Sequence, residues 1–217
     1  MTTREKIIEE SRKYFNQHGY AAASLYQIAQ TIGISRGNLT YHFSDKEILL
    51  DLHLDNLKSE YDQSLMNSVV VPSWQSLNKA TEYFHKIQLD YSFIFFDKKV
   101  VLLPKVTELI KSLRDNNIKT QMSMINISIQ MGNMKKEPFA GVYHNLSRSI
   151  WMITYFWLLT KSFSGDKDVS WEKIVWSMIL PYFTTKGLSS FTEHFGKPYF
   201  NTLGVSYEKY LGNSLAF

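Results

Sequence analysis

The amino-acid sequence predicts an all-α protein, with an N-terminal three-helix unit containing a helix-turn-helix (residues 1–47) joined to a larger helical domain (residues 48–217). Three observations support this fold class. Apolar residues recur at intervals of three and four along most of the chain. Helix-capping pairs precede the first helices. Residues 24–47 place two short helices on either side of a tight turn.

The composition is that of a folded globular protein. With 44% hydrophobic and 20% charged residues, the 217-residue chain can bury a sizeable core. It contains no cysteine, which excludes disulfides and thiolate metal sites and fits a reducing compartment. The first fifteen residues carry charges where a signal peptide needs an apolar core, so we expect a cytoplasmic protein.

The first helix is predicted from its two ends and one apolar face. Thr2 and Glu5 have capping-box spacing, in which each side chain accepts from the other residue's backbone N–H. Gly19 ends the helix. One face can roof the two helices that follow, and its apolar residues are Ile7, Ile8, Tyr14 and Phe15.

The second helix begins at Leu25, because Ser24 and Gln27 repeat the capping-box spacing. Gly33 ends it, since glycine tolerates the positive φ that a helix end requires. Its buried face follows the i, i+3, i+4, i+7 pattern and consists of Leu25, Ile28, Ala29 and Ile32.

A third helix over residues 36–42 follows after a short turn, and Ser35 is placed to cap it. Its outward flank has the residues that a recognition helix needs. Arg36 can reach guanine bidentately, and Thr40 can touch a thymine methyl or a base edge. Gly37 lets the backbone come close to the major groove.

Phosphate contacts fix the register of a protein on DNA without reading sequence, and Tyr41, His42 and Lys46 suit them. Residues 1–46 carry a net charge of only +2, so the prediction of DNA binding rests on the motif and not on charge. The predicted DNA-binding residues are Ser24, Tyr26, Ser35, Arg36, Gly37, Asn38, Thr40, Tyr41, His42 and Lys46.

The run IAQTIGISRGNLTYHFSDKEILL resembles the DNA-binding signature of the TetR family of transcriptional regulators, IA-x-x-x-GVS-x-G-x-(L/I)-Y-x-HF-x-x-K-x-x-L. It departs from that signature at Thr40 and Tyr41, where many members carry two aromatic residues. SIWMITYFWLL and WSMILPYFTTKG resemble one C-terminal subclass of these repressors. The resemblance implies a homodimer on a near-palindromic DNA operator, released by a small effector.

A fourth helix of about 20 residues is predicted next, with Ser44 and Glu47 as its capping box. By similarity to the family, this helix is the lever that sets the distance between two recognition helices. A loop is expected over residues 67–73, because Pro72 cannot continue a helix. The stripe along the helix consists of Leu50, Leu54, Leu57, Tyr61 and Leu65.

The middle of the chain predicts three helices: Trp74 to about Asp97, Pro104 to about Asn116, and Ile118 to about Lys135. Their aromatic residues and methionines suit either a plain hydrophobic core or a mostly apolar cavity for a small hydrophobic effector. The candidate effector-binding residues are Trp74, Tyr83, Phe84, Tyr91, Phe95, Met122, Ile125 and Asn126.

The stretch over residues 150–159 is almost wholly apolar but too short to span a membrane, which needs about 20 such residues. It must be buried on every side, so one face needs a partner chain. A further helix, from Trp171, contributes a second apolar face, and Pro181 should kink it or mark the start of a new segment. From Glu193 we expect a loop and one short terminal helix. The predicted homodimer residues are Ile150, Ile153, Trp157, Trp171, Ile174, Val175 and Met178.

The sequence does not favour an enzyme. The six histidines lack HExxH spacing, and no GxGxxG, Walker or GxSxG run is present, so we expect no catalytic residues, metal or cofactor. Two alternatives to a repressor stay open: a helical regulator that acts through protein contacts, and an activator of the same fold. The effector, the operator and the regulated genes cannot be read from the sequence.

Overall fold

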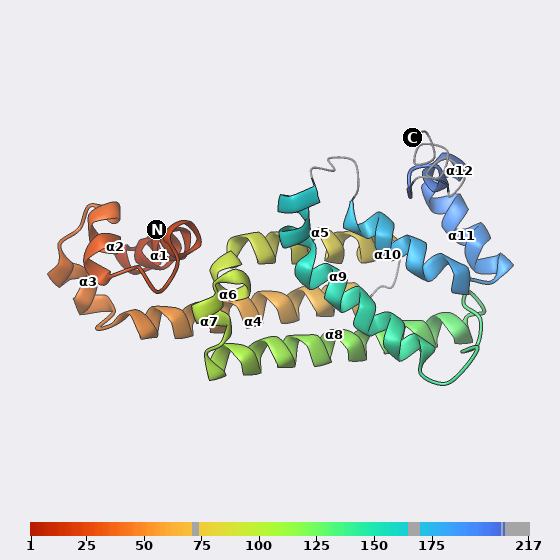
Figure 1. Ribbon diagram of the computed structural model, residues 1–217, viewed down its shortest axis with the longest axis horizontal. Helices are drawn as coiled ribbons and strands as arrows, with labels where there is room; N and C mark the ends of the chain where they lie inside the picture. Colours follow the sequence, from red (N-terminus) through yellow and green to blue (C-terminus); the bar gives the residue numbers. More distant parts are fainter. Residues whose placement is uncertain (71–73, 165–169, 205, 207–217) are drawn as a thin grey trace, which may run out of the picture. The chain divides into compact units, whose positions relative to one another are not determined.

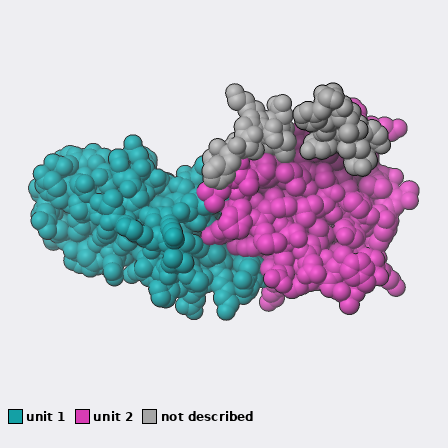
Figure 2. All heavy atoms as spheres, viewed as in Figure 1, with its two compact units in different colours: residues 1–70, 79–115 teal, residues 71–78, 116–217 magenta. Residues whose placement is uncertain are grey.

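The computed structural model describes residues 1–70, 74–164, 170–204 and 206. Over these residues the chain is helical, with one isolated β-bridge between Met134 and Phe183, so the predicted all-α class is confirmed (Figure 1). No described helix is both long and apolar enough to cross a bilayer. The chain forms two compact units, residues 1–70 with 79–115 and residues 71–78 with 116–217 (Figure 2). The predicted division by function at residue 47 stays a prediction.

The first three helices have the predicted bounds: α1 (Thr3–His18), α2 (Leu25–Ile32) and α3 (Arg36–His42). Both predicted capping boxes are present, Thr2 with Glu5 and Ser24 with Gln27. Gly33 ends α2 in the left-handed conformation, with φ of 77°. The apolar sides of the three helices meet in one core, whose buried residues include Ile7, Phe15, Ile28, Ile32, Leu39 and Phe43.

Helix α4 (Lys46–Val70) is longer than predicted and begins differently. The predicted Ser44–Glu47 capping box is wrong, because the backbone N–H of Ile48 donates to Asp45 Oδ1 at 2.9 Å. Asp45 is therefore the residue whose side chain caps the first turn. The helix continues through Val70, so the predicted loop over 67–73 is helical in its first part and lies outside the described residues in its second.

The predicted helix from Trp74 to Asp97 is three elements: α5 (Trp74–Asp90), α6 (Ser92–Phe96) and α7 (Lys98–Val101). The chain leaves helical geometry at Tyr91 and again at Asp97. Three consecutive residues of α6, Phe93, Ile94 and Phe95, are buried, which a single helix with one buried face does not allow. The breaks therefore follow from burial of this aromatic run.

Helix α8 (Pro104–Gln130) is continuous, so the two helices predicted on either side of Asn116–Asn117 are wrong. Asparagine is only a moderately poor helix former and keeps its backbone N–H, unlike proline. The helix instead stops before Gly132, which has φ of 76°.

The distal unit contains α9 (Val142–Ser164), α10 (Trp171–Ile179), the 3₁₀ helix η1 (Leu180–Tyr182), α11 (Thr185–Phe195) and α12 (Lys197–Phe200). Pro181 lies in the first turn of η1, so it marks the start of a new segment, one of the two outcomes predicted for it. Helix α11 was not predicted; Thr184 caps it by accepting from the Gly187 N–H at 3.2 Å. Residues 165–169 and most of the tail beyond Gly204 lie outside the described residues.

Gly187 fixes how α11 packs within the distal unit. A Cβ at this position would lie 2.1 Å from the backbone oxygen of Asn133, which no other amino acid avoids without a backbone shift. The close approach brings α11 against an aromatic core. The buried members of that core are Met134, Tyr143, Leu146, Ile150, Trp176, Leu180, Phe183 and Phe191.

Candidate nucleic-acid interface

Helix α3 has one buried side and one side exposed to solvent. Ser35 Oγ accepts from the Asn38 N–H at 3.1 Å and so caps the helix, as predicted. Leu39 and Phe43 are buried. The opposite flank, with Arg36, Gly37, Asn38 and Tyr41, is exposed. A short helix that presents one polar flank in this way has the form of a recognition helix.

Nothing in the described part of the chain requires a glycine at position 37. An ideal Cβ there would meet only Ser35 Oγ, at 3.9 Å, and the backbone does not have positive φ. Glycine inside a helix costs roughly 0.5–1 kcal/mol relative to alanine. The missing side chain is therefore best explained by something outside the chain that approaches the helix backbone closely.

The remaining predicted residues of α3 divide by their contacts. Thr40 Oγ1 donates to the carbonyl of Arg36 at 3.0 Å, which leaves its methyl group and its lone pairs for an outside partner. Tyr41 is 85% exposed, and its ring packs edge-on against His42 with centroids 5.2 Å apart. Tyr41 therefore projects into solvent from a fixed base, which suits a phosphate contact.

On α2, Ser24 and Tyr26 are both exposed. Ser24 Oγ caps the helix by accepting from the Gln27 N–H at 3.3 Å, and it donates to Gln27 Oε1 at 2.8 Å. Tyr26 accepts from Gln30 Nε2 at 2.8 Å, which fixes its ring direction. The exposed ends of these side chains can meet a DNA backbone, and that contact stays a prediction.

Lys46 differs from the other predicted phosphate ligands, because its ammonium group is used inside the protein. Nζ donates to the carbonyls of Tyr20 at 3.0 Å and Ala23 at 2.9 Å, and lies 4.5 Å from the centre of the Tyr20 ring. Its evident role is to hold the turn between α1 and α2. Lys6 acts similarly, since its Nζ donates to Ile32 O at the end of α2. Such long-range lysine contacts have no local sequence signal.

The family model for bacterial regulatory proteins of the tetR family matches residues 7–52. These residues span α1 to the start of α4 and include every residue of α3. Residues 7–52 are therefore a TetR-family amino-terminal domain.

One curated relative is the HTH-type transcriptional repressor AcnR of Corynebacterium diphtheriae, which is 46% identical over 46 residues. The match covers 21% of this chain and 24% of that protein, so the chain spans about a quarter of the length of this relative. The sequence likeness to this relative is therefore limited to 46 residues.

Solved structures share the fold over most of the chain. A TetR-family regulator from Marinobacter aquaeolei has a TM-score of 0.76 at 20% identity, and the match covers 89% of this chain and 97% of that one. AibR, solved in complex with isovaleryl coenzyme A and operator DNA, has a TM-score of 0.59 at 15% identity, covering 83% and 97%. At these identities the likeness establishes the fold alone.

The predicted effector residues fall into two groups. Tyr83, Phe84, Tyr91 and Phe95 belong to the first compact unit, and Trp74, Met122, Ile125 and Asn126 to the second. Trp74 packs into the aromatic core of the second unit, with Trp176 and Phe191 rings 5.6 and 5.4 Å away, and its indole N–H donates to Ser190 Oγ. A common effector cavity for both groups stays a prediction.

One pocket of about 230 Å³ lies in the first unit. Of the predicted effector residues only Tyr91 lines it, and burial, reinforced by its bond to Glu60, raises the pKa of Tyr91. His53 also lines it; burial and the nearby Arg12 guanidinium lower the pKa of His53 to about 4. The residues around the pocket are Glu5, Ile8, Glu9, Arg12, His53, Asn56, Glu60 and Tyr91.

The predicted homodimer residues are not equally available to a partner. Ile150 and Trp171 are buried within the chain, whereas Ile153, Trp157, Ile174, Val175 and Met178 are partly exposed. Sequence reasoning missed the exposed stripe of α9, which consists of Met152, Phe156 and Leu159. The i, i+4, i+7 spacing of these residues is present in the sequence. Because the stretch is apolar on every side of the helix, the sequence does not show which side faces solvent.

Proposed function

We propose that this protein is a sequence-specific DNA-binding transcriptional regulator that binds a near-palindromic operator as a homodimer. The single observation that carries the proposal is the division of α3, with Leu39 and Phe43 buried and a glycine-containing polar flank exposed. In the TetR-family frame, that flank enters the major groove, Arg36 and Thr40 read bases, and Tyr41 and His42 hold phosphates.

The test is selection of random-sequence DNA duplexes by the full-length protein, followed by binding measurements on the selected sequence. The proposal predicts two related half-sites in inverted orientation, because two-fold protein symmetry imposes two-fold symmetry on the operator. Enrichment of no sequence over the starting library would contradict it.

The homodimer is supported by the exposed stripe on α9. Met152 and Phe156 are 53% and 50% exposed, which is unusual for large apolar side chains on one face of a helix. A second copy of the same face would cover both stripes across a two-fold axis. The partly exposed apolar residues of α10 extend the proposed interface.

The proposal also includes release by a small hydrophobic effector and a repressor role, which is the role that AcnR is named for. AibR, which shares the fold, was solved with both a small molecule and operator DNA. A ligand that prefers the DNA-incompetent state by about 3 kcal/mol reduces operator occupancy roughly a hundredfold. Linkage requires operator DNA to weaken ligand binding by the same factor, which calorimetric titration with and without the selected duplex measures.

A further inference from the structure

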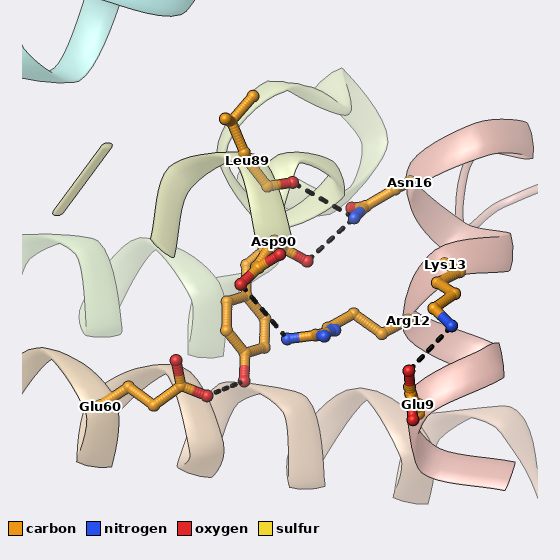
Figure 3. Close-up of polar contacts among 8 residues, drawn as sticks. Glu9, Arg12, Lys13, Asn16, Glu60, Leu89 and Asp90 are labelled. Atoms are coloured by element: carbon orange, nitrogen blue, oxygen red, sulfur yellow. Dashed lines mark hydrogen bonds and ion pairs between the residues drawn. The ribbon is translucent and has the colours of Figure 1, made fainter. Parts of the chain in front are cut away.

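Asn16 joins α1 to the chain between residues 89 and 99, which we call the elbow. Its Nδ2 donates to the carbonyl of Asp90 at 2.9 Å and to that of Leu89 at 3.3 Å, the last carbonyls of α5 (Figure 3). Its Oδ1 accepts from the N–H of Phe93, in the first turn of α6, at 3.1 Å. One side chain of α1 thus binds the end of one helix and the start of the next.

These contacts replace caps that the elbow lacks. The first N–H and last C=O groups of a helix have no partner within it. Tyr91, the N-cap residue of α6, makes no side-chain cap bond. A carboxamide has two donors and one acceptor site that can serve both helix ends at once, whereas a carboxylate can only accept. The arrangement therefore requires asparagine and not aspartate at position 16.

Asp97 makes a second connection between the elbow and the DNA-binding helices. Its Oδ1 accepts from the Lys99 N–H at 2.9 Å and caps α7. Its Oδ2 accepts from the Tyr20 N–H at 3.2 Å, in the turn that links α1 to α2. Lys46, the first residue of α4, holds the same turn through the Tyr20 carbonyl.

The elbow is also bound to α4. Arg12 of α1 lies 5.1 Å from the centre of the Tyr91 ring and 3.9 Å from the Asp90 carboxylate. The Tyr91 hydroxyl donates to Glu60 Oε1 of α4 at 2.7 Å (Figure 3). Contacts from α1, the following turn and α4 therefore converge on one segment, so the elbow fixes the direction of α1 with respect to α4.

We propose that Asn16 and Asp97 are positioning residues for operator binding: through the elbow they hold α1 to α3 at the angle to α4 that sets the spacing between the two recognition helices of the dimer. This inference rests on the proposed function, and goes beyond it by naming the side chains that fix the spacing. Neither residue lies on α3, so neither is required to touch a base.

The experiment compares Asn16→Asp and Asp97→Asn with wild type in full-length protein. Each change is nearly isosteric. Asn16→Asp replaces the two N–H donors with a carboxylate oxygen, and Asp97→Asn replaces one of the two acceptor oxygens with an amide NH2 group. Gln17→Glu and Asp55→Asn make the same chemical changes at exposed neighbouring sites and serve as controls. For every protein, random duplexes are selected, and affinity is then measured for the wild-type operator and for a duplex with one half-site.

In the two variants we expect a changed or broadened spacing between half-sites and a loss of operator affinity on the order of tenfold, within the usual range for coupling between sites. Affinity for the single half-site should stay at the wild-type value. Wild-type spacing in both variants would overturn the inference, and so would equal losses on the operator and the half-site, which a merely structural role predicts. A wild-type selection without paired half-sites overturns the proposed function itself and, with it, this inference.

Discussion

The residues in and next to α3 are of two kinds: some pack or cap the helix, and others make no contact that the fold requires. Leu39 and Phe43 are buried, and Ser35 caps the first turn, so a change at any of these destabilises the helix. Gly37 makes no demand on the fold, because a Cβ would fit without contact closer than 3.9 Å. This difference separates effects on DNA binding from effects on stability.

Gly37→Ala should weaken binding to the selected operator by tenfold or more, on the order of 1–3 kcal/mol, because the added methyl group keeps the helix from the groove. The melting temperature should stay unchanged or rise, since alanine favours a helix by roughly 0.5–1 kcal/mol over glycine. Electrophoretic mobility shift and thermal denaturation measure the two effects. Gly204→Ala, at another uncrowded glycine, is the control, and operator binding equal to this control would remove α3 from the interface.

His53 predicts a specific dependence of stability on pH. Ser11 Oγ donates to Ile8 O, so the bond of 3.0 Å to His53 is donated by Nε2–H of a neutral imidazole. Burial, with Arg12 nearby, lowers the pKa of His53 from 6.5 to about 4. Between pH 6.5 and 4 the imidazole of His53 is therefore protonated in the unfolded chain but neutral in the folded one. The contribution of His53 to the free energy of unfolding is complete above pH 6.5 and falls as the pH drops toward 4.

The loss should be on the order of 3 kcal/mol across that window. Denaturant unfolding at several pH values measures it. His53→Gln should flatten the curve between pH 6.5 and 4.5, whereas His18→Gln, at an exposed histidine of α1, should keep the wild-type slope. Parallel curves for wild type and His53→Gln would show that another group is responsible.

Among the elements, the sequence predicted those whose ends carry local signals. The bounds of α1, α2 and α3 followed from Thr2, Ser24 and Ser35, whose side chains cap the helices, and from the glycines after α1 and α2. The breaks at Tyr91 and Asp97 could not be predicted, because the caps that stabilise them include Asn16 and so come from a distant helix. Helix α11 was not predicted. It contains Gly187, which is required by a close contact with Asn133, and that contact cannot be read from the sequence around the helix.

The same distinction applies to the predicted sites. The residues of α3 were predictable because their order along one short helix determines which side they face. The internal hydrogen bonds of Lys46 were not predictable, since its partners Tyr20 and Ala23 precede it by more than twenty positions. The dimer residues were predicted from apolar stretches of sequence. Which of these residues pack into the core of their own chain, and which remain exposed for a partner, depends on the fold and could not be read from the sequence.

Helix α9 carries the prediction about assembly. Phe156→Glu should convert a dimer of about 50 kDa into a monomer of about 25 kDa in light scattering, because an unpaired charge buried in an interface costs several kcal/mol. Operator affinity should fall with it. Leu102→Glu is the control, as Leu102 is a similarly exposed apolar residue of the other unit. Ile150→Glu is a poorer choice, since Ile150 is buried in its own subunit. A wild-type monomer at micromolar concentration would contradict the proposed interface.

At the scale of the whole molecule, the chain combines a TetR-family DNA-binding domain with a helical remainder whose fold matches TetR-family structures over most of its length. The family model matches residues 7–52, while the fold likeness covers 89% of the chain. The proposed effector site can thus differ from those of proteins that share the fold, because its chemistry depends on side chains and not on the fold.

The most direct test of the central claim, that α3 reads DNA sequence, is the fluorescence anisotropy of the selected duplex titrated with full-length protein beside a scrambled duplex of equal length. We expect saturation at two protomers per duplex and an affinity higher than for scrambled DNA by a factor on the order of a thousand or more. Affinity for both duplexes should fall as salt rises, since phosphate contacts release counterions. Equal affinity for the selected and scrambled duplexes would contradict the account.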